Sequence, residues 1–195
     1  MINDLIIYSA PYFCKRISKD DYDDLQDFAV RVRNQYGYAL QAFIQEQALS
    51  EDDKRLNNTF IVRNIQTLEV VAYFSLRSGM ISANERRVQF RRVFDTVPGV
   101  ELSNFAVNDN YIRKHNKESG VGAIVFSDFI IPIVDQASKY VGISVIYIYA
   151  LPEKNLISRY RQYGFERLEK RQERSLHRRF RPYYDEGCIF MYIGL

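Results

Sequence analysis

The chain has 195 residues, of which 47% are hydrophobic and 26% are charged, and its formal net charge is +3. This length suits one globular domain with a sizeable core, and the charge is too mild to indicate nucleic-acid binding by the whole chain. The two cysteines, Cys14 and Cys188, lie near opposite ends without metal-ligand spacing. Neither a disulfide framework nor a metal site is therefore expected.

No segment is typical of a signal peptide or a membrane helix. The amino-terminus carries Asp4 and no basic region. The longest apolar stretch, Ala123 to Val134, is interrupted by Asp128 and Pro132 and is shorter than the roughly 20 residues that span a bilayer. We expect a cytoplasmic protein without a membrane partner, and we find no linker that would divide residues 1–195 into separate domains.

The first half of the chain predicts two helices and an antiparallel hairpin. Ser18 and the acids after it form an N-cap for a helix that Gly37 interrupts. The expected elements are a strand at Tyr12–Cys14, helices from about Tyr22 to Val32 and Tyr38 to Leu49, a loop from Ser50 to Asn58, strands at Thr59–Arg63 and Glu69–Arg77, and a basic excursion from Ser82 to Pro98, with a weak strand signal from Val88 to Phe94.

The second half alternates strands and helices, which implies a right-handed parallel crossover. Together with the hairpin of the first half, this order predicts a mixed sheet. The expected elements are a strand at Val100–Val107, a polar loop from Asn108 to Ser119, a long helix from Gly120 to Tyr140, a strand at Ile143–Tyr149, a short helix from Glu153 to Tyr163 that Gly164 stops, and a closing strand from Gly187 to Gly194.

The turn between the strand ending at Val107 and the helix starting near Gly120 suits a phosphate or pyrophosphate. Gly120 and Gly122 leave the backbone uncovered, and the first N–H groups of a helix lack internal partners and sit at the positive end of its dipole. Lys117 adds a cation beside them. A plain tight turn is the alternative, and neither a Walker-type loop nor a dinucleotide-binding Gly-x-Gly-x-x-Gly is present.

A second motif follows one crossover later. The order of strand, Arg/Gln-x-x-Gly-x-Gly/Ala loop, helix, strand and Tyr-x-x-x-Gly-Phe resembles the GNAT-type N-acetyltransferases. The matching residues, within about Val100 to Leu168, are Lys117-x-x-Gly120-x-Gly122 and Tyr160-x-x-x-Gly164-Phe165. Lys117 replaces the usual Arg or Gln, which keeps charge but loses planar bidentate geometry.

The resemblance implies an α/β fold with a mixed, mostly antiparallel sheet of six to seven strands. Helices would cover both faces, and one central pair of strands would be parallel. Within a single N-acetyltransferase domain, residues 1–99 would form the half with two helices and a hairpin, 100–168 the cofactor-binding core, and 169–195 a basic tail and closing strand. Pro132 should kink the long helix roughly three turns from the phosphate site.

The resemblance also implies that the donor is acetyl-CoA and that no metal takes part. The loop backbone would bind the pyrophosphate, and the strand, which carries a bulge in the family, would bind the pantetheine arm. Asn155 looks like an asparagine often found at the start of the next helix. The cofactor-binding residues are then Phe105, Ala106, Val107, Lys117, Glu118, Ser119, Gly120, Val121, Gly122, Ala123 and Asn155.

The implied chemistry is direct attack of an amine on the thioester carbonyl, which needs a base and an acid. By resemblance, Tyr160 is the acid and Glu101 the base acting through water, with Ser103 on the same strand face as a substrate contact or proton relay. The alternatives are a core aromatic for Tyr160 and a solvated strand-end carboxylate for Glu101. His115 and His177 are other candidate bases, although a loop histidine such as His115 is usually exposed.

The basic tail leaves the partner open. Arg167 to Arg181 mixes cations with Glu169 and Glu173 and is followed by Tyr183 and Tyr184. A solvated charged face is the simpler interpretation, and binding of RNA or an acidic protein is the other. We therefore expect acetyl-CoA and an amine as partners, do not favour nucleic acid, and keep two alternatives: a catalytically silent GNAT-fold binding module, and a transferase for another acyl-CoA. The sequence does not indicate an oligomeric state.

Overall fold

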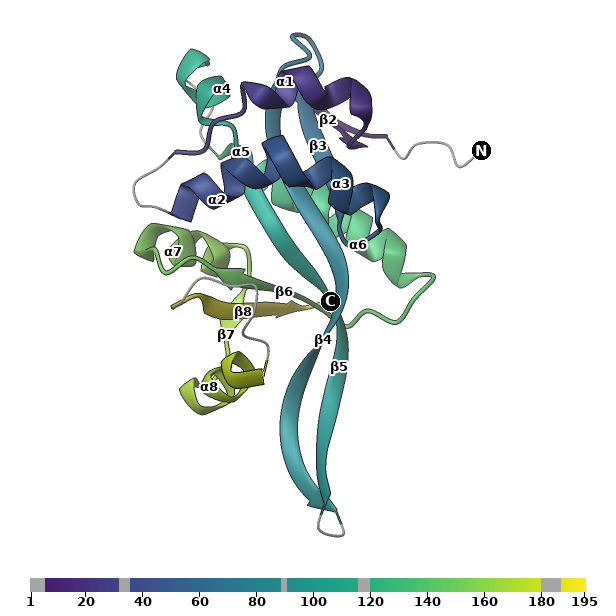
Figure 1. The fold of residues 1–195 in the computed structure, drawn as a ribbon, viewed down its shortest axis with the longest axis vertical. Helices are drawn as coiled ribbons and strands as arrows, with labels where there is room; N and C mark the ends of the chain where they lie inside the picture. Colours follow the sequence, from purple (N-terminus) through teal and green to yellow (C-terminus); the bar gives the residue numbers. More distant parts are fainter. Residues whose placement is uncertain (1–5, 32–35, 89–90, 116–119, 180–186) are drawn as a thin grey trace. The chain divides into compact units, whose positions relative to one another are not determined.

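The computed structural model describes residues 6–31, 36–88, 91–115, 120–179 and 187–195, without the side chains of 36, 82–95 and 178–179. Its strands form one eight-stranded sheet in the order β1-β2-β3-β4-β5-β6-β8-β7 (Figure 1). The strands are β1 (Ile7–Ser9), β2 (Tyr12–Arg16), β3 (Asn58–Asn64), β4 (Val70–Val88), β5 (Arg91–Val107), β6 (Val145–Ala150), β7 (Glu166–Arg167) and β8 (Ile189–Gly194).

The sheet is mostly antiparallel with one parallel pair. The parallel pair joins β5 to β6, and it matches Gly99 with Val145 and Glu101 with Tyr147. The GNAT-like mixed α/β fold is therefore confirmed, with eight strands rather than six or seven. Short edge strands that pair only with one neighbour, such as β1 and β7, carry too little pattern to be predicted from sequence.

The described helices form six segments along the chain. Several of them contain a 3-10 or π-helical turn, where the hydrogen-bond spacing changes without ending the helix. They are η1 (Lys19–Asp21) with α1 (Tyr22–Gln26); α2 (Tyr36–Ala42), η2 (Phe43–Gln47) and α3 (Ala48–Asp53); α4 (Asp109–Lys114); α5 (Val121–Val125), η3 (Phe126–Ile130) and α6 (Ile131–Ser138); α7 (Lys154–Gln162); and α8 (Lys170–Arg179).

The chain divides into two compact units, and β4 and β5 run through both. Unit 1 comprises residues 1–77 and 102–133, and unit 2 comprises residues 78–101 and 134–195. Each unit has its own hydrophobic cluster. The unit 1 cluster joins the first helices to the sheet through Ile17, Leu25, Phe28, Phe43, Ile44, Ala48, Ile61, Val70, Tyr73 and Ala106, and the unit 2 cluster consists of Ile81, Val145, Tyr147, Leu176 and Phe190.

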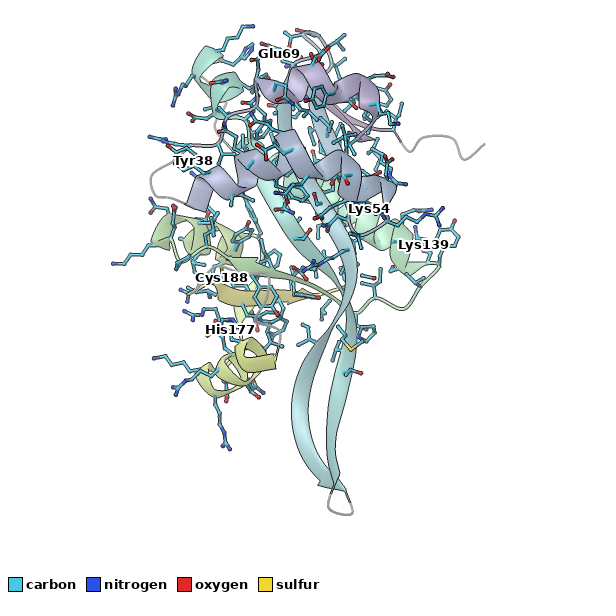
Figure 2. The ribbon with its side chains drawn as sticks, viewed as in Figure 1. Tyr38, Lys54, Glu69, Lys139, His177 and Cys188 are labelled. Atoms are coloured by element: carbon cyan, nitrogen blue, oxygen red, sulfur yellow. The ribbon has the colours of Figure 1, made fainter. Side chains whose placement is uncertain are left out.

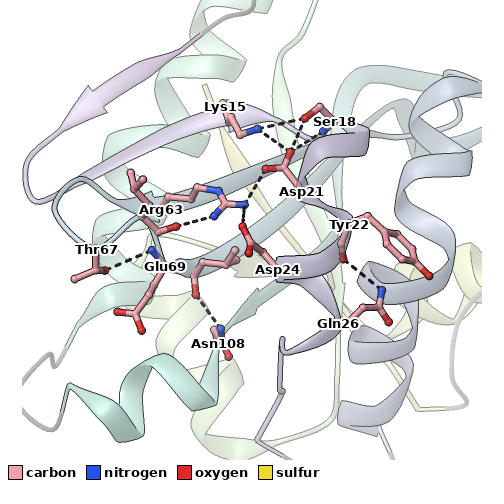
Figure 3. Close-up of polar contacts among 12 residues, drawn as sticks. Lys15, Ser18, Asp21, Tyr22, Asp24, Gln26, Arg63, Thr67, Glu69 and Asn108 are labelled. Carbon is pink, nitrogen blue, oxygen red and sulfur yellow. Dashed lines mark hydrogen bonds and ion pairs between the residues drawn. The ribbon is translucent and has the colours of Figure 1, made fainter.

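Buried charges help to hold unit 1 together. Arg63 is only 7% exposed and donates to Asp21 at 2.8 Å, while Lys15 donates to the other oxygen of the same carboxylate at 2.7 Å (Figure 3). Burial alone would raise the pKa of Asp21, but hydrogen bonds from Lys15, Ser18 and Arg63 together lower it. The network ties β2 and β3 to the first helical turn.

Two glycines in unit 2 make room for one aromatic ring. A Cβ on Gly79 would lie 1.9 Å from the Tyr147 hydroxyl oxygen, and a Cβ on Gly99 would lie 2.7 Å from Val145 Cγ2 and 3.3 Å from Tyr147 Cδ1. The absence of side chains there lets Tyr147 pack closely against both long strands. Tyr147 also stacks on Phe190, with ring centroids 5.5 Å apart.

Several predicted boundaries in unit 1 are wrong. The first helix ends at Gln26 rather than near Val32, and Gly37 lies inside α2 instead of interrupting a helix. The expected Ser50–Asn58 loop begins with α3, because Asp52 is buried and accepts hydrogen bonds from Arg16 and from the Thr59 backbone N–H. A tertiary anchor thus extends a helix that its polar sequence does not predict.

One expected loop and the basic excursion also contain regular structure. The Asn108–Ser119 segment contains α4, because the Asn108 side chain accepts from the Asn110 N–H and caps that helix. The described residues of the Ser82–Pro98 excursion belong to β4, which ends at Val88, and to β5, which begins at Arg91, and the two strands continue as a ribbon (Figure 1).

The long helix predicted from Gly120 to Tyr140 is confirmed as α5, η3 and α6. Its π-helical turn ends directly before Ile131. Pro132, which we expect to kink the helix, lies just after this turn, where the wider hydrogen-bond spacing of a π-helix tolerates the backbone N–H that proline lacks. Among the described residues, the run Val121–Ser138 is the one helix long and apolar enough to cross a membrane. Core helices of globular proteins can have the same length and apolar composition, and Val125, Phe129, Ile130 and Val134 are completely buried here.

Candidate functional site

The end of β5 and the start of α5 are fixed by a single asparagine and a single glycine in unit 1. Asn108 donates its side-chain amide to the Val70 carbonyl at 2.8 Å (Figure 3). Its backbone N–H donates to the Val71 carbonyl at 2.8 Å. These bonds pin the chain to β4 directly after Val107. An asparagine at a strand-to-helix junction is a recognisable N-cap signal, and the sequence analysis missed it.

Gly120 begins α5 in the left-handed conformation, with φ of 86°. It is exposed, and a Cβ at this position would meet nothing within 4 Å, so the backbone is open to a ligand. The Ala123 and Ile124 N–H groups bond back to the Gly120 carbonyl, at 2.8 and 3.1 Å. The N–H groups of Val121 and Gly122 precede them and are the ones that a helix leaves without internal acceptors.

This local geometry is what a pyrophosphate site requires. The open glycine, the unshielded helix start and its dipole would all favour an anion. Lys117, Glu118 and Ser119 lie outside the described residues, so their roles stay predictions. Val121 is buried and anchors the helix, while Gly122 and Ala123 continue its first turn.

The strand residues Phe105, Ala106 and Val107 lie at the end of β5, as predicted. The parallel pairing of β5 with β6 covers Gly99 to Glu101, and β5 then continues to Val107. Ala106 is buried in the unit 1 cluster, and Phe105 and Val107 are half-buried.

Tyr160 lies in α7 of unit 2 and is only 3% exposed. Its ring contacts Tyr163 and Phe165 edge-on, with centroids 6.0 and 5.4 Å away, and its carbonyl accepts from the Phe165 N–H. Gly164 closes α7 with φ of 94°, which allows the turn that brings Phe165 back. The Tyr-x-x-x-Gly-Phe motif is thus a compact aromatic turn.

Burial, and to a lesser extent the neighbouring Tyr163, raises the pKa of Tyr160 well above its usual value. The hydroxyl is therefore protonated at neutral pH, as a general acid must be. Among the described residues, no hydrogen bond to this hydroxyl is found. Its use as the acid stays a prediction.

Glu101 lies on β5, opposite Tyr147 of β6, and is 3% exposed. The alternative of a solvated strand-end carboxylate is therefore wrong. A buried carboxylate beside a parallel strand pair is compatible with the predicted role as base, which remains untested.

Ser103 follows on the same strand, within unit 1. Its hydroxyl donates to Asn57 Oδ1 at 2.7 Å and lies 3.2 Å from the Ser75 carbonyl. It is partly exposed, whereas Asn57 is 4% exposed. Asn57 had no signal in the sequence, because its partner lies 46 positions away.

The remaining candidates are less closely tied to the site. Asn155 is exposed in the first turn of α7. His115 is half-buried at the end of α4, where it pairs with Glu69 at 2.8 Å, and is therefore not a free loop side chain. His177 lies on α8 (Figure 2), and its buried Nε2 has no partner among the described residues. Within the same residues, no group of three or more potential ligands is arranged to hold a metal.

Comparison with known proteins supports the fold. No protein-family model matches the sequence, and no curated protein matches it either. Among solved structures, the chain resembles a Tyr-to-Phe mutant of the AtaT toxin bound to the C-terminus of the antitoxin AtaR and acetyl-CoA, with a TM-score of 0.65 and 18% identity over 94% of this chain and 93% of that one.

Two further structures are similar at the same level. AtaT complexed with acetyl-methionyl-tRNAfMet gives a TM-score of 0.66 at 17% identity over 94% of both chains. A KacTA–DNA complex gives 0.60 at 17% identity over 94% of this chain and 92% of that one. At such identities the likeness establishes the GNAT-like fold alone.

Proposed function

We propose that this chain is an acetyl-CoA-dependent N-acetyltransferase that acts by direct attack of an amine. The observation that carries the proposal is the open start of α5 at Gly120, which follows the strand that also bears Glu101. The sequence motifs and the fold shared with acetyl-CoA-bound AtaT support it.

The donor would be held mainly by backbone. The N–H groups of Val121 and Gly122 would bind the pyrophosphate together with Lys117, Glu118 and Ser119, and the β5 backbone from Phe105 to Val107 would pair with the pantetheine amides. Backbone donors suit this task because they are fixed by the helix and strand and need no reorganisation on binding.

The chemistry would then require one proton to leave the amine and one to reach the sulfur. The amine nitrogen attacks the thioester carbonyl, and Glu101 accepts the amine proton through a water molecule. As the C–S bond breaks, the Tyr160 hydroxyl protonates the departing thiolate. Burial keeps Tyr160 protonated until that step.

For the acceptor, we propose the α-amine of an aminoacyl-tRNA. The fold is shared with AtaT, which was solved with acetyl-methionyl-tRNAfMet. In this chain, α8 is anchored by Glu173, which accepts from the Phe190 N–H and from Arg167, both at 3.0 Å, so that Lys170, Arg171 and Arg174 remain exposed. Exposed cations on one helix suit a phosphate backbone.

The test is acetyl-CoA turnover with three probes: methionyl-tRNA, spermidine and a lysine-containing peptide, each with and without Tyr160→Phe and Glu101→Gln. We expect the wild type to transfer acetyl to at least one of these amines, and both Tyr160→Phe and Glu101→Gln to lose that transfer. Binding of acetyl-CoA without transfer to any probe would favour the silent binding module, and faster turnover with propionyl-CoA would favour the other acyl donor.

The same assay tests the acceptor. Arg171→Glu combined with Arg174→Glu should raise the KM for methionyl-tRNA and leave the KM for acetyl-CoA unchanged. Transfer to spermidine or the peptide alone would contradict the tRNA assignment while preserving the acetyltransferase.

A further inference from the structure

A short polar chain crosses unit 1 and ends on β5. Glu51 of α3 accepts a short hydrogen bond from Asn57 Nδ2, and Asn57 Oδ1 accepts from the Ser103 hydroxyl at 2.7 Å. Asn57 is buried and Glu51 and Ser103 are partly exposed. The chain therefore begins at a helix carboxylate and reaches the strand that carries the candidate base and the pantetheine-binding residues.

The carboxylate of Glu51 fixes which way the Asn57 amide faces. An ionised carboxylate can only accept hydrogen bonds, so the nearby amide atom must be the NH2 group. The opposite orientation would place the amide oxygen against the carboxylate and leave two acceptors facing each other. Asn57 must therefore present its oxygen, and not its nitrogen, to Ser103.

This orientation fixes the Ser103 hydroxyl in turn. A hydroxyl has one proton and two acceptor lone pairs. The proton is directed to Asn57 Oδ1, with the Ser75 carbonyl as a longer second acceptor at 3.2 Å. Within the described part of the chain, nothing donates to Ser103 Oγ. The oxygen can therefore act toward a ligand only as an acceptor, and Ser103 is partly exposed.

We propose that Ser103 Oγ binds an N–H of the attacking amine, and that Asn57 and Glu51 are positioning residues that hold Ser103 as an acceptor. The inference rests on the proposed acetyltransferase function and specifies a contact within it. A neutral primary amine has two N–H groups and one lone pair. Donation of one N–H to Ser103 leaves the lone pair free to attack and the second N–H free for the general base.

The direct test is Ser103→Ala with whichever of methionyl-tRNA, spermidine or peptide the wild type acetylates fastest. Loss of one neutral hydrogen bond should raise the amine KM about 5- to 10-fold. The acetyl-CoA KM and the slow hydrolysis of acetyl-CoA without amine should stay unchanged, because neither involves the amine. Ser103→Thr keeps the hydroxyl and should restore most of the amine affinity.

A matched control separates this contact from general damage. Thr59→Val removes a completely buried hydroxyl of the neighbouring pair, Thr59 with Ser75 at 2.8 Å, and should leave the amine KM unchanged. Glu51→Gln permits the Asn57 amide to turn over and should raise the amine KM by a smaller factor than Ser103→Ala, about 2- to 4-fold if half of the bond is lost.

The outcomes are distinct. A wild-type protein that transfers acetyl to no amine would overturn the proposed function itself. If the wild type is active and Ser103→Ala has an unchanged amine KM, or if Thr59→Val raises that KM equally, the Ser103 contact is refuted. An unchanged amine KM in Glu51→Gln beside a raised one in Ser103→Ala would refute the positioning role.

Discussion

Both units of this chain combine aromatic packing with buried charges, but they place the charges differently. In unit 1, charged and polar side chains are buried between the helices and the sheet, with Arg63 and Asp21 at the centre. In unit 2, Tyr147 stacks on Phe190 and Tyr149 meets Phe190 edge-on at 5.2 Å, and the buried carboxylate of Glu173 bonds to the Phe190 backbone beside these rings.

The candidate site residues are divided between the two units. Unit 1 carries the open helix start at Gly120 and the acceptor oxygen of Ser103, both of which need polar groups held in one orientation. Unit 2 carries Tyr160 and Glu101, both of which are buried.

The largest expected effect is a loss of stability when the charge network of unit 1 is broken. Arg63→Met leaves Asp21 buried with Lys15 as its remaining cation, and removal of one partner from a buried ion pair costs about 3 kcal/mol or more of unfolding free energy. Denaturant unfolding measures it. The control is Lys54→Met on the exposed end of α3 (Figure 2), which should change stability by less than about 0.5 kcal/mol.

The same variant has a defined pH dependence. The pKa of Asp21 is lowered in the folded state, so its contribution is complete above the unfolded pKa of about 3.9 and is lost as the pH falls through the lower folded value. The stabilities of wild type and Arg63→Met should therefore converge in acid. A constant gap down to the acid limit would show that lost packing, not charge, causes the effect.

The next effect concerns chemistry in unit 2. Tyr160→Phe keeps the ring contacts with Tyr163 and Phe165 but removes the hydroxyl proton. We expect kcat to fall about 100-fold, the low end for loss of a general acid, with unchanged acetyl-CoA affinity and melting temperature. Steady-state kinetics with the best amine measure it. Full activity would show that Tyr160 is only a core aromatic.

Two glycine variants test whether acetyl-CoA binding depends on the exposed backbone at the start of α5. Gly120 and Gly187 both have positive φ, 86° and 95°, and neither has a close neighbour where a Cβ would stand. Alanine at either should cost about 1–2 kcal/mol of strain. Only Gly120→Ala should also weaken acetyl-CoA binding in calorimetry. Equal affinities in the two variants would remove the α5 start from the donor site.

The smallest effect is expected at the end of α4. Hydrogen bonds from Lys114, and less from His115, hold the pKa of Glu69 at about 2. Glu69→Gln should cost about 0.2–1 kcal/mol at neutral pH, because the pair is partly solvated. That difference should persist above pH ~5 and disappear as the pH falls toward about 2. A difference that instead grows in acid would contradict the ion pair.

The sequence predicted secondary structure correctly where that structure depends on neighbouring residues. The β-branched run at Thr59–Arg63 and the Gly164 helix stop are both found as predicted, since each depends on neighbouring residues only. The open conformation of Gly120 also agrees with the phosphate-site prediction. The roles of the site residues themselves remain to be tested.

The incorrect predictions concern structure that depends on contacts between residues far apart in the sequence. The extension of α3 depends on Asp52 contacting Arg16, 36 positions away, and the orientation of Ser103 depends on Asn57, 46 positions away. In the basic excursion only a weak strand at Val88–Phe94 was predicted, because the polar side chains of β4 and β5 there hide the alternation on which strand prediction relies. Polar partners far apart along the chain leave no periodic pattern.

The most direct test of the donor site is an acetyl-CoA titration followed by backbone amide chemical shifts. We expect saturable chemical-shift changes at Val121 and Gly122 and along Phe105–Val107, with a dissociation constant that matches calorimetry, and little change in β8. Absence of saturable shifts at the α5 start, with or without binding elsewhere, would contradict the proposed donor site.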